Sequence, residues 1–556
     1  MSHTLFVIEA PGKSDKLREI LSQTKGLGDF EVVATRGHFC RMPSELDPLY
    51  IDDNLRETAR HADEVTKKLL LDGCDGAKEV VIATDSDAEG EVIARDVFSI
   101  VSGVAPVISR MKFLAIARDS IVEAYHSRKP FDEKPAYSGD ARRVFDRLMG
   151  AALCDREKKI YSGRVQAALL NFVGKREPVA GEAVVALRAS DGGRDFIAKV
   201  PYTKSQEDVV MRLVESASKM EPVDVASRVS TVTSRPWGFG DAVVKAHVAT
   251  GMPVSRVSEV MQGLYESGKM TYPRSSARAI HESTVSSLER IAKEHRVKFD
   301  ASRVPTLYGN GVDGVSVSHP SPAPLVGVDL NAPLRTLSPE DRVLSVITRN
   351  LMESGISRVV EVADLTGCEG LPQSLSFSRV DRPLSWERAV TPGLVKYDPQ
   401  ASMILLMQSA GIGRPSTLVS HADKFVERGL LGEDMRLSEK GRQWLDSLPK
   451  AFGKISPALL EFAFDLLPGT PQERLRTIVA MIGDAGSEVI RRFEEITKGE
   501  FPNLPDRADV QLRSQRLQES IRERRAIEAG VIGGKPTAVS PEPSFTPVLT
   551  PLTASR

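Results

Sequence analysis

In residues 1–110, short apolar runs alternate with stretches of helical periodicity. The runs Leu5–Ile8, Phe30–Thr35 and Val80–Ala83 predict buried strands, because each is short, apolar and bounded by turn residues or charges. Such alternation predicts an α/β domain with a mostly parallel sheet. Helices are expected between the strands, near Lys13–Gln23, over Asp53–Leu71 and near Gly90–Ile100.

The rest of the chain changes character several times. Residues 134–176 and 397–498 have helical patterns, and residues 181–234 and 359–389 contain the alternation typical of strands. Between the strand-rich stretches, we expect helix over Asp241–Glu294 with an interruption at Met270–Ser276, a loop at Asn310–Asn331 and a helix at Pro339–Glu353. The chain therefore has several domains, and two of them are built from separated segments.

Two C-terminal segments differ from everything before them. Arg507–Glu528 is a charged helical stretch with six arginines, and we expect a solvated helix there. Lys535–Arg556 is rich in Pro, Thr and Ser, which predicts a disordered tail of unknown partner.

Composition excludes several classes of protein. Lys+Arg is 74 and Asp+Glu is 75, so the net charge of −1 argues against a chain that is basic throughout, but a local basic channel remains compatible with it. The four cysteines lie far apart without a CxxC pair, which excludes a four-cysteine zinc ribbon. No apolar run is long enough for a transmembrane helix, and the N-terminus does not resemble a signal peptide. We expect a cytoplasmic protein with no membrane partner.

The most informative segment is Val80–Glu91, where a predicted strand ends at Ala83 and carboxylates follow at alternate positions. Asp85, Asp87 and Glu89 at the carboxyl end of a strand can converge on one hard cation. Mg²⁺ prefers a few carboxylates together with water and phosphate oxygens. The alternative is an exposed acidic turn that caps the next helix.

A further carboxylate, Glu9, follows the first predicted strand. Glu9 joins the same site if the two strands are neighbours, and Lys13 at the start of the next helix is placed to meet a phosphate. The alternatives are a helix N-terminal charge for Glu9 and a solvated lysine for Lys13. These two segments resemble the Toprim domain, with its single glutamate on the first strand and its DxD segment. That resemblance implies nucleic-acid phosphoryl transfer and leaves the reaction open.

A second motif is Leu264–Ser276, which contains Thr271-Tyr-Pro-Arg274. Pro273 biases Tyr272 away from helix, so the hydroxyl is presented outside regular helix. Arg274, two residues on, can hold the same phosphate and offset charge in a transition state. This segment resembles the active-site segment of type IA DNA topoisomerases.

The resemblance covers residues 3–500 through further ordered motifs: Gly37–Pro43, the arginine helix Ala141–Gly150, Gly163-Arg-Val-Gln166, Gly411-Ile-Gly-Arg-Pro-Ser-Thr417 and Leu437–Gly441. Arg142, Arg143 and Arg147 recur at helical spacing and can line a backbone groove, or pair with Asp140 and Asp146. Arg164 can reach a phosphate, and Gly411–Gly413 is expected to open a helix whose N–H groups form an anion site with Arg414, Ser416 and Thr417. By resemblance, the DNA-binding residues are His38, Arg142, Arg143, Asp146, Arg164, Gln166, Glu266, Arg414, Ser416 and Thr417.

The chain departs from the family in four respects. Ala88 stands where the family has arginine after its DxD, and Ser276 stands where it has aspartate after the tyrosine. His319 fits the family's histidine, although the prolines of Ser318–Pro324 alter the backbone around it; the alternative is a loop histidine without a role. The cysteines of the C-terminal zinc-binding region of some members are missing.

The resemblance implies a multidomain fold that forms a torus, with α/β, helical and β-rich parts. Its expected domains are a Rossmann-like Toprim domain (1–133), a helical DNA-binding gate domain (134–180 and 408–500), a β-rich arch (181–234 and 356–407), a winged-helix-like tyrosine domain (235–355), a charged helical extension (501–534) and the tail (535–556).

The implied enzyme is a monomeric, ATP-independent topoisomerase that acts on single-stranded segments of underwound DNA. Tyr272 forms a 5′-phosphotyrosine link, Arg274 stabilises the phosphoryl charge, and Glu9 with Lys13 supports proton transfer. Glu9, Asp85, Asp87 and Glu89 hold Mg²⁺. Strand passage and religation then relax or decatenate DNA. His319 is counted with the catalytic residues, and we expect it either to support the residues that react or to contact DNA.

Two other functions remain open at this point. A Toprim nuclease or primase-like enzyme needs no tyrosine and forms no covalent adduct with DNA. A non-catalytic single-stranded DNA-binding protein binds DNA and never nicks it.

Overall fold

The computed structural model describes residues 3–155, 157–223, 226–307, 319–365, 371–372, 374–380, 384–387, 390–485, 491, 493–495, 504–505 and 507–528. The predicted tail at 535–556 and part of the loop at 310–331 lie outside these residues.

The N-terminal part is built on a five-stranded sheet of order β2-β1-β5-β6-β7, in which only the β6–β7 pair is antiparallel. Strand β1 alternates between two cores: Phe6 and Ile8 pack on one face of the sheet, and Leu5 and Val7 pack on the other. Both faces are therefore covered, as the apolar runs predict. The strands are β1 (His3–Ile8), β2 (Phe30–Ala34), β5 (Ala77–Ile82), β6 (Ile108–Arg110) and β7 (Lys129–Pro130).

The helices of this part divide between the two faces. Helices α1 (Ser14–Ser22) and α4 (Arg118–His126) contribute to the core that contains Phe6. Helices α2 (Glu64–Cys74) and α3 (Ala88–Val101) contribute to the core that contains Leu5. The predicted α/β domain is confirmed as a sheet between two helical layers.

The prediction of one helix over Asp53–Leu71 is wrong in its first half. Helix α2 starts only after Asp63, whose side chain accepts a hydrogen bond from the Thr66 N–H at 2.9 Å and caps it. Before it, the carboxylate of Asp52 accepts from two backbone N–H groups and forms a turn. The segments before and after this turn, β3 (Cys40–Arg41) and β4 (His61–Ala62), pair in a two-stranded antiparallel ladder. The length and charge of Asp53–Leu71 are typical of a helix, but the hydrogen bonds that Asp52 accepts form a turn in its first half.

The helical parts share one apolar core. Phe145, Phe239, Val257, Met403 and Phe464 all belong to a single buried cluster that spans them. The helices before and after the strand-rich region are α5 (Tyr137–Leu153), α6 (Arg164–Lys175), α12 (Pro399–Ala410), α13 (Leu418–Glu427), α14 (Glu439–Ser447), α15 (Pro457–Leu466), α16 (Pro471–Ala485) and α18 (Arg507–Glu528). Between the strand-rich segments lie α8 (Phe239–Thr250), α9 (Val254–Glu266), α10 (Val285–Glu294), α11 (Pro339–Ser354), β11 (Ile280–His281) and β12 (Thr306–Leu307).

The strand-rich segments 181–234 and 359–389 meet in one antiparallel six-stranded sheet of order β10-β13-β14-β9-β8-β15. Helix α7 (Glu207–Lys219) packs on β8 and β9. It lies within residues 181–234, where only strands were expected. The strands are β8 (Val179–Leu187), β9 (Phe196–Thr203), β10 (Ser227–Val232), β13 (Arg358–Ala363), β14 (Ser378–Val380) and β15 (Gly393–Lys396).

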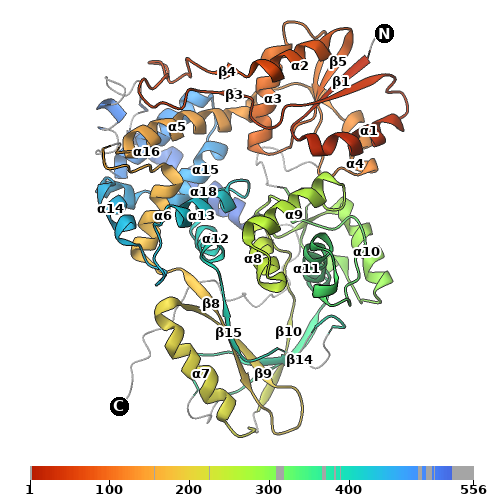
Figure 1. Cartoon of the computed structure of the whole chain (residues 1–556), viewed down its shortest axis with the longest axis vertical. Helices are drawn as coiled ribbons and strands as arrows, with labels where there is room; N and C mark the ends of the chain where they lie inside the picture. The colour runs from red at the N-terminus through yellow and green to blue at the C-terminus, as the bar shows by residue number, and fades with distance from the viewer. Residues whose placement is uncertain are drawn as a thin grey trace.

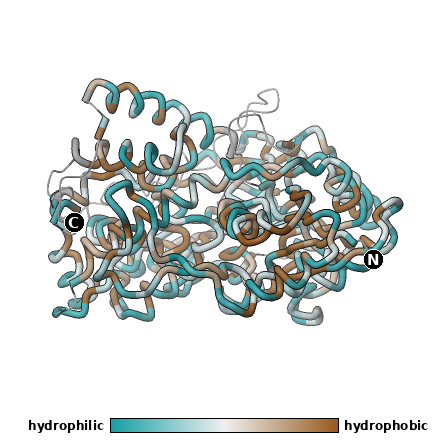
Figure 2. Tube along the Cα trace, turned by 90° about the horizontal axis from the view of Figure 1, so that it is seen from above, coloured by the Kyte–Doolittle hydropathy of each residue, from teal (hydrophilic) through white to brown (hydrophobic). Residues whose placement is uncertain are grey.

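The parts are arranged in a ring-like order (Figure 1). The five-stranded sheet lies at one end and the six-stranded sheet at the other, with α5–α6 and α12–α18 along one side and α8–α11 along the other. Figure 2 shows hydrophobic and hydrophilic residues alternating along the helices, as expected for helices with one face in a core. This arrangement fits the expected multidomain torus. The exact domain boundaries stay predictions.

The expectation that Arg507–Glu528 forms a solvated helix, α18, is wrong. Val510, Leu517 and Ile521 are buried in the large helical core, and α18 contacts α15 and α16. The helix is therefore packed and not solvated, because these three apolar residues fall on one face; Leu512, on the other side, is exposed. Within the residues that the structure describes, no helix is long and apolar enough to cross a membrane.

Candidate active site

The first two acidic segments meet because strands β1 and β5 are parallel neighbours, with Val7 opposite Ile82. Glu9 follows the end of β1, and Asp85 and Asp87 follow the end of β5, so these carboxylates gather at one edge of the sheet. Asp87 also caps α3, because its carboxylate accepts from the Gly90 N–H at 2.7 Å. Asp87 therefore caps the next helix, as in the alternative interpretation, but Asp85 is buried and not part of an exposed turn. The metal role of these carboxylates stays a prediction.

Tyr272 reaches this edge from the other side of the molecule. Its backbone N–H donates to the carbonyl of Leu114 at 3.1 Å, which ties the segment to the N-terminal part. The side chain is 3% exposed, and its hydroxyl donates to Asp87 Oδ2 at 2.6 Å. Burial, and then the charge of Asp87, raises the pKa of the Tyr272 hydroxyl well above its usual value. The phenol is thus protonated and aimed at a carboxylate that can accept its proton.

His319 lies directly against the tyrosine. The His319 and Tyr272 ring centroids are 4.4 Å apart, and the Ser275 hydroxyl donates to the His319 carbonyl. Both ring nitrogens are buried with no hydrogen-bond partner among the described residues. Burial lowers the pKa of His319, so the ring is neutral at neutral pH. The structure therefore brings the predicted histidine into the site.

Lys13 and a second tyrosine hold Asp85. Lys13 is 1% exposed and donates to Asp85 Oδ1, and the Tyr265 hydroxyl donates to the same oxygen at 3.1 Å. The ammonium group of Lys13 also lies 4.8 Å from the centre of the Tyr265 ring. Lys13 is not the solvated lysine of the alternative interpretation.

Glu9 is the carboxylate with an unused oxygen. Its Oε2 is buried and has no hydrogen-bond partner in the described part of the chain. Burial, and then the charges of Asp85 and Asp87, raises the pKa of Glu9 to about 8, and the nearby Lys13 only partly opposes this. Excess negative charge is therefore packed at this edge of the sheet.

The donor set suits a hard divalent cation, because these side chains supply carboxylate oxygens and the Glu9 oxygen lacks a partner. The convergence expected from the sequence is not preformed, however. The described residues contain no group of three or more His, Cys, Asp or Glu side chains arranged to hold a metal ion. Lys13 engages Asp85, and Tyr272 engages Asp87, so these two carboxylates already have partners.

Glu89 faces a different neighbour. Arg274, Arg414 and the Ser416 side chain lie close enough to Glu89 to lower its pKa. Burial, followed by the charge of Asp87, outweighs these effects and raises the pKa of Glu89. The loop 411–417 between α12 and α13 therefore reaches the acidic edge of the sheet.

Behind that loop lies a second charged group, the arginine–carboxylate cluster. Two carboxylates of α15, Glu461 and Asp465, are surrounded by arginines from four elements. Asp465 accepts from Arg414 at 2.5 Å and contacts Arg142 at 3.5 Å. Arg164 donates to Glu461 and to Asp146, the latter at 2.7 Å. The cluster consists of Arg142, Asp146, Arg164, Arg414, Glu461, Asp465 and Arg524.

The expectation that Gly411–Gly413 opens a helix is wrong. Gly411 ends α12 in the left-handed region, with φ +65°, and α13 begins only at Leu418. The Gly413 N–H donates to Glu461 at 3.2 Å, so a protein carboxylate takes the place expected for an external anion. Thr417 precedes α13 without a side-chain capping bond.

The other predicted DNA-binding residues have mixed surroundings. Arg143 pairs with Glu57 and Asp140, which matches the alternative considered from sequence, and Arg147 donates to three backbone carbonyls. Gln166 is buried and donates to the His421 carbonyl, while His38 is exposed. Their DNA contacts stay predictions.

Two glycines let the tyrosine-bearing segment approach the N-terminal part closely. At Gly268, which follows α9 with φ +70°, an added Cβ would lie 2.5 Å from the Ile116 carbonyl oxygen. At Gly12, an added Cβ would lie 2.4 Å from Glu266 Oε2, which places the predicted Glu266 at the same junction. The junction is tight because neither glycine has a side chain, which lets the other part of the molecule approach its backbone closely.

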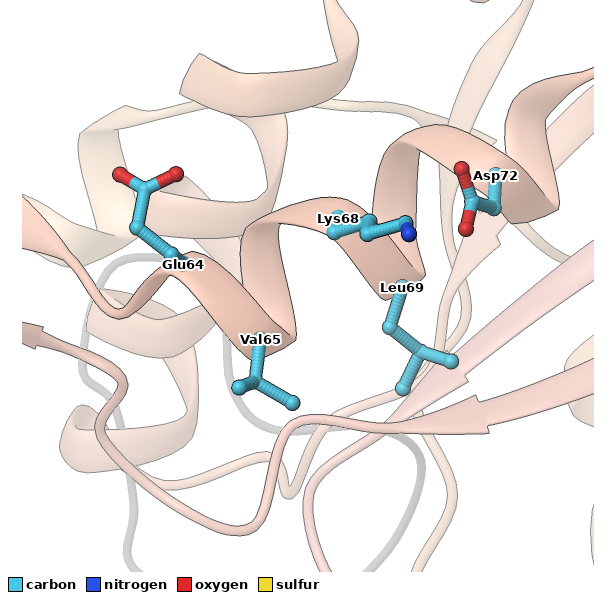
Figure 3. A pocket seen from close by; sticks show the side chains of 5 residues that line it. All are labelled: Glu64, Val65, Lys68, Leu69 and Asp72. Atoms are coloured by element: carbon cyan, nitrogen blue, oxygen red, sulfur yellow. The ribbon is translucent and has the colours of Figure 1, made fainter.

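Sequence reasoning missed Tyr265, Glu461, Asp465 and Arg524. A weak signal exists for the two carboxylates, because Glu461 and Asp465 share one face of an otherwise apolar helix. A shallow hollow along α2 is lined by Glu64, Val65, Lys68, Leu69 and Asp72, all from one helix, and includes none of the site residues (Figure 3).

Comparison with known proteins agrees with this geometry. Residues 4–116 match the Toprim domain. DNA topoisomerase 1 of Synechocystis is 23% identical over 76% of this chain and 57% of its own length, and DNA topoisomerase 1 of Pyrococcus horikoshii is 22% identical over 82% and 74%. Full-length topoisomerase I from Thermotoga maritima matches in fold with a TM-score of 0.57 and 18% identity, over 93% of this chain and 90% of that one.

Residues 4–116 therefore match the Toprim domain, and the chain has the fold of a topoisomerase I. Its resemblance to the type IA DNA topoisomerases, expected from the sequence motifs, is confirmed over most of its length. Toprim domains are associated with divalent metal binding. The chain spans just over half the length of the Synechocystis relative.

Proposed function

We propose that this protein is a type IA DNA topoisomerase that cuts one DNA strand, passes another strand through the break and reseals it. The observation that carries the proposal is Tyr272, whose buried hydroxyl donates to Asp87 inside the acidic edge of the Toprim sheet. A nucleophile held against a proton acceptor, beside excess carboxylates, is what transient phosphodiester cleavage needs.

In this mechanism, Tyr272 Oη attacks a DNA phosphorus and its proton passes to Asp87 Oδ2. The bond to the 3′ oxygen breaks, and the tyrosine keeps the 5′ phosphate, so that resealing needs no ATP. Arg274 lies near Asp87 and Glu89 and stabilises the charge of the phosphoryl oxygens.

Glu9 is the proposed general acid for the departing 3′ oxygen. Its unpartnered Oε2 is in position to hold a proton, and its raised pKa is in keeping with that role. Lys13 orients Asp85 and supplies positive charge within the cluster. The buried ring of His319 packs on Tyr272 and restricts the tyrosine to one orientation.

Mg²⁺ is the proposed metal, and Glu9, Asp85, Asp87 and Glu89 would hold it. Asp85 and Asp87 would then have to give up their present partners, Lys13 and Tyr272. When bound, the ion supplies charge that aligns the cut ends for resealing. One oxygen of Glu9 cannot donate a proton and bind the ion at the same time, so the two roles belong to different stages.

DNA must enter between the parts that now enclose Tyr272. The hydroxyl is buried, so the contacts of Tyr272 and Gly268 with the N-terminal part have to separate before a strand can reach it. The six-stranded sheet at the far end, which connects to both sides of the molecule, is the proposed hinge (Figure 1). Single-stranded segments of underwound DNA are the proposed substrate.

One assay separates this function from its alternatives. The protein is incubated with single-stranded DNA labelled on either side of the break and then denatured. We expect the label to remain on the protein only when it lies on the strand with the 5′ phosphate. Free labelled fragments without an adduct would favour a Toprim nuclease, and intact DNA would favour a non-catalytic binding protein.

A further inference from the structure

The C-terminal helix α18 reaches the arginine–carboxylate cluster through one side chain. Arg524 is 8% exposed, and its Nη1 donates to Asp465 Oδ2 at 3.3 Å. The same guanidinium lies 5.2 Å from the centre of the Phe462 ring, also on α15. Helix α18 is seated in the helical core by Val510, Leu517 and Ile521, so this contact is held in place.

Asp465 connects Arg524 to the loop 411–417, because it also binds Arg414 of that loop. Arg414 donates to the oxygen that Arg524 also contacts, so the two arginines share one carboxylate oxygen. Arg142 and Ser138 hold the other oxygen. Although burial alone would raise it, Arg414, Arg142 and Arg524 hold the pKa of Asp465 well below its usual range. Asp465 is therefore a fixed negative charge that anchors Arg414.

The loop in turn contacts the acidic edge of the Toprim sheet. The Ser416 side chain and the charge of Arg414 both lie close enough to Glu89 to lower its pKa, against the larger opposing effect of burial. A continuous path of contacts thus runs from Arg524 through Asp465 and Arg414 to Ser416 and Glu89. Each step joins a different element: α18, α15, the loop after α12, and α3.

We propose that Arg524 is a positioning residue for the acidic site, acting through Asp465 on the loop that holds Glu89. The C-terminal helix is then part of the catalytic apparatus, although it lies outside the Toprim and tyrosine-bearing segments. Losing the Arg524 charge leaves Asp465 with fewer partners, shifts Arg414 and loosens the hold of Ser416 on Glu89. The inference rests on the proposed function, because its readouts are DNA relaxation and metal binding.

The test uses the full-length protein with Arg524→Gln, Arg524→Lys and the control Arg522→Gln, an exposed arginine on the same helix. Work is done below the lowest unfolding temperature of the set. For Arg524→Gln we expect kcat for plasmid relaxation to fall roughly threefold to tenfold, with KM for plasmid unchanged. The MgCl₂ concentration that gives half of the metal-induced rise in Tm should increase by a similar factor.

Arg524→Lys, which keeps the charge, should recover most of both effects, and Arg522→Gln should match the wild type. The proposal is overturned if Arg524→Gln keeps the wild-type kcat and MgCl₂ midpoint, or if Arg522→Gln changes them equally. The variant Glu89→Gln distinguishes a failure of the proposed metal site from a failure of the proposed role of Arg524. If it leaves the MgCl₂ midpoint unchanged, the proposed metal role fails; if it shifts the midpoint and Arg524→Gln does not, only the role of Arg524 fails.

Discussion

This molecule contains two buried groups of charged side chains, and they differ in how well the cations balance the carboxylates. At the acidic edge of the Toprim sheet, carboxylates outnumber the cations, Glu9 Oε2 has no partner among the described residues, and the pKa of Glu9 is raised to about 8 by burial and its acidic neighbours. In the arginine–carboxylate cluster, Asp465 is surrounded by arginines that hold its pKa low. An unbalanced group has capacity for a ligand, whereas a satisfied group fixes structure.

The largest expected effect concerns the nucleophile in the unbalanced group. Tyr272→Phe should reduce relaxation of negatively supercoiled plasmid by about 10⁴-fold or more, because no other hydroxyl replaces Tyr272 against Asp87. Tyr265→Phe is the matched control, since Tyr265 is also buried and donates to Asp85. It should retain most activity. Equal losses in both variants would remove the distinction between the tyrosines.

Metal removal tests the same group from the ligand side. Excess EDTA should lower relaxation by roughly 10²-fold or more, and added MgCl₂ should restore it, because the excess carboxylates need a cation to align the cut ends. Binding of single-stranded DNA, measured by fluorescence anisotropy, should persist in EDTA. Undiminished relaxation in EDTA would contradict the metal role.

The satisfied cluster predicts a loss of stability. Asp465→Asn leaves Arg142, Arg414 and Arg524 without their shared carboxylate, and a broken buried pair typically costs about 3–5 kcal/mol. The free energy of unfolding from urea denaturation measures this. Asp146→Asn is the milder comparison, since Asp146 is partly exposed and Arg164 keeps Glu461. An unchanged unfolding free energy for Asp465→Asn would contradict a structural role for the cluster.

The dependence of the unfolding free energy on acid pH follows from the carboxylate of Asp465. The folded pKa of Asp465 is depressed, so its stabilisation is fully present above its unfolded pKa of about 3.8 and is lost as pH falls below it. The difference in unfolding free energy between wild type and Asp465→Asn should therefore be constant near neutral pH and shrink below about pH 4. A difference that grows on acidification would have the wrong sign.

The smallest effect is expected at the junction between the parts. Gly268→Ala places a Cβ 2.5 Å from the Ile116 carbonyl oxygen at φ +70°, and we expect a loss of about 1–3 kcal/mol in thermal unfolding. Gly263→Ala on α9 has nothing within 4 Å of the added Cβ and should be neutral or stabilise by about 0.5–1 kcal/mol. Equal behaviour of the two variants would argue against a tight junction.

The sequence predicted the elements that depend on local patterns. The strands β1, β2 and β5 were predicted because apolar runs next to turns are local signals, and the neighbouring β1 and β5 then brought Glu9 to Asp85 and Asp87. The two separate motifs that contain Tyr272 and His319 also led to side chains that meet, with 4.4 Å between the ring centroids.

Other features depend on contacts between distant segments, which no local pattern contains. The arginines 142, 164 and 414 were expected to face phosphates, and their carboxylate partners come from α15, far along the chain. Helix α18 was expected to be solvated because its charges dominate its composition, and three apolar residues on one face decided its packing. Gly411 was taken to open a helix, whereas its positive φ ends one.

The most direct test of the central claim is to identify the residue that becomes attached to DNA. The protein is reacted with a single-stranded oligonucleotide, denatured and digested, and the peptide that carries a nucleotide is sequenced by mass spectrometry. The account predicts a 5′-phosphate linked to Tyr272 and none on the adjacent buried Tyr265. A nucleotide on Tyr265 or another residue, or no adduct from an enzyme that relaxes plasmid, would contradict it.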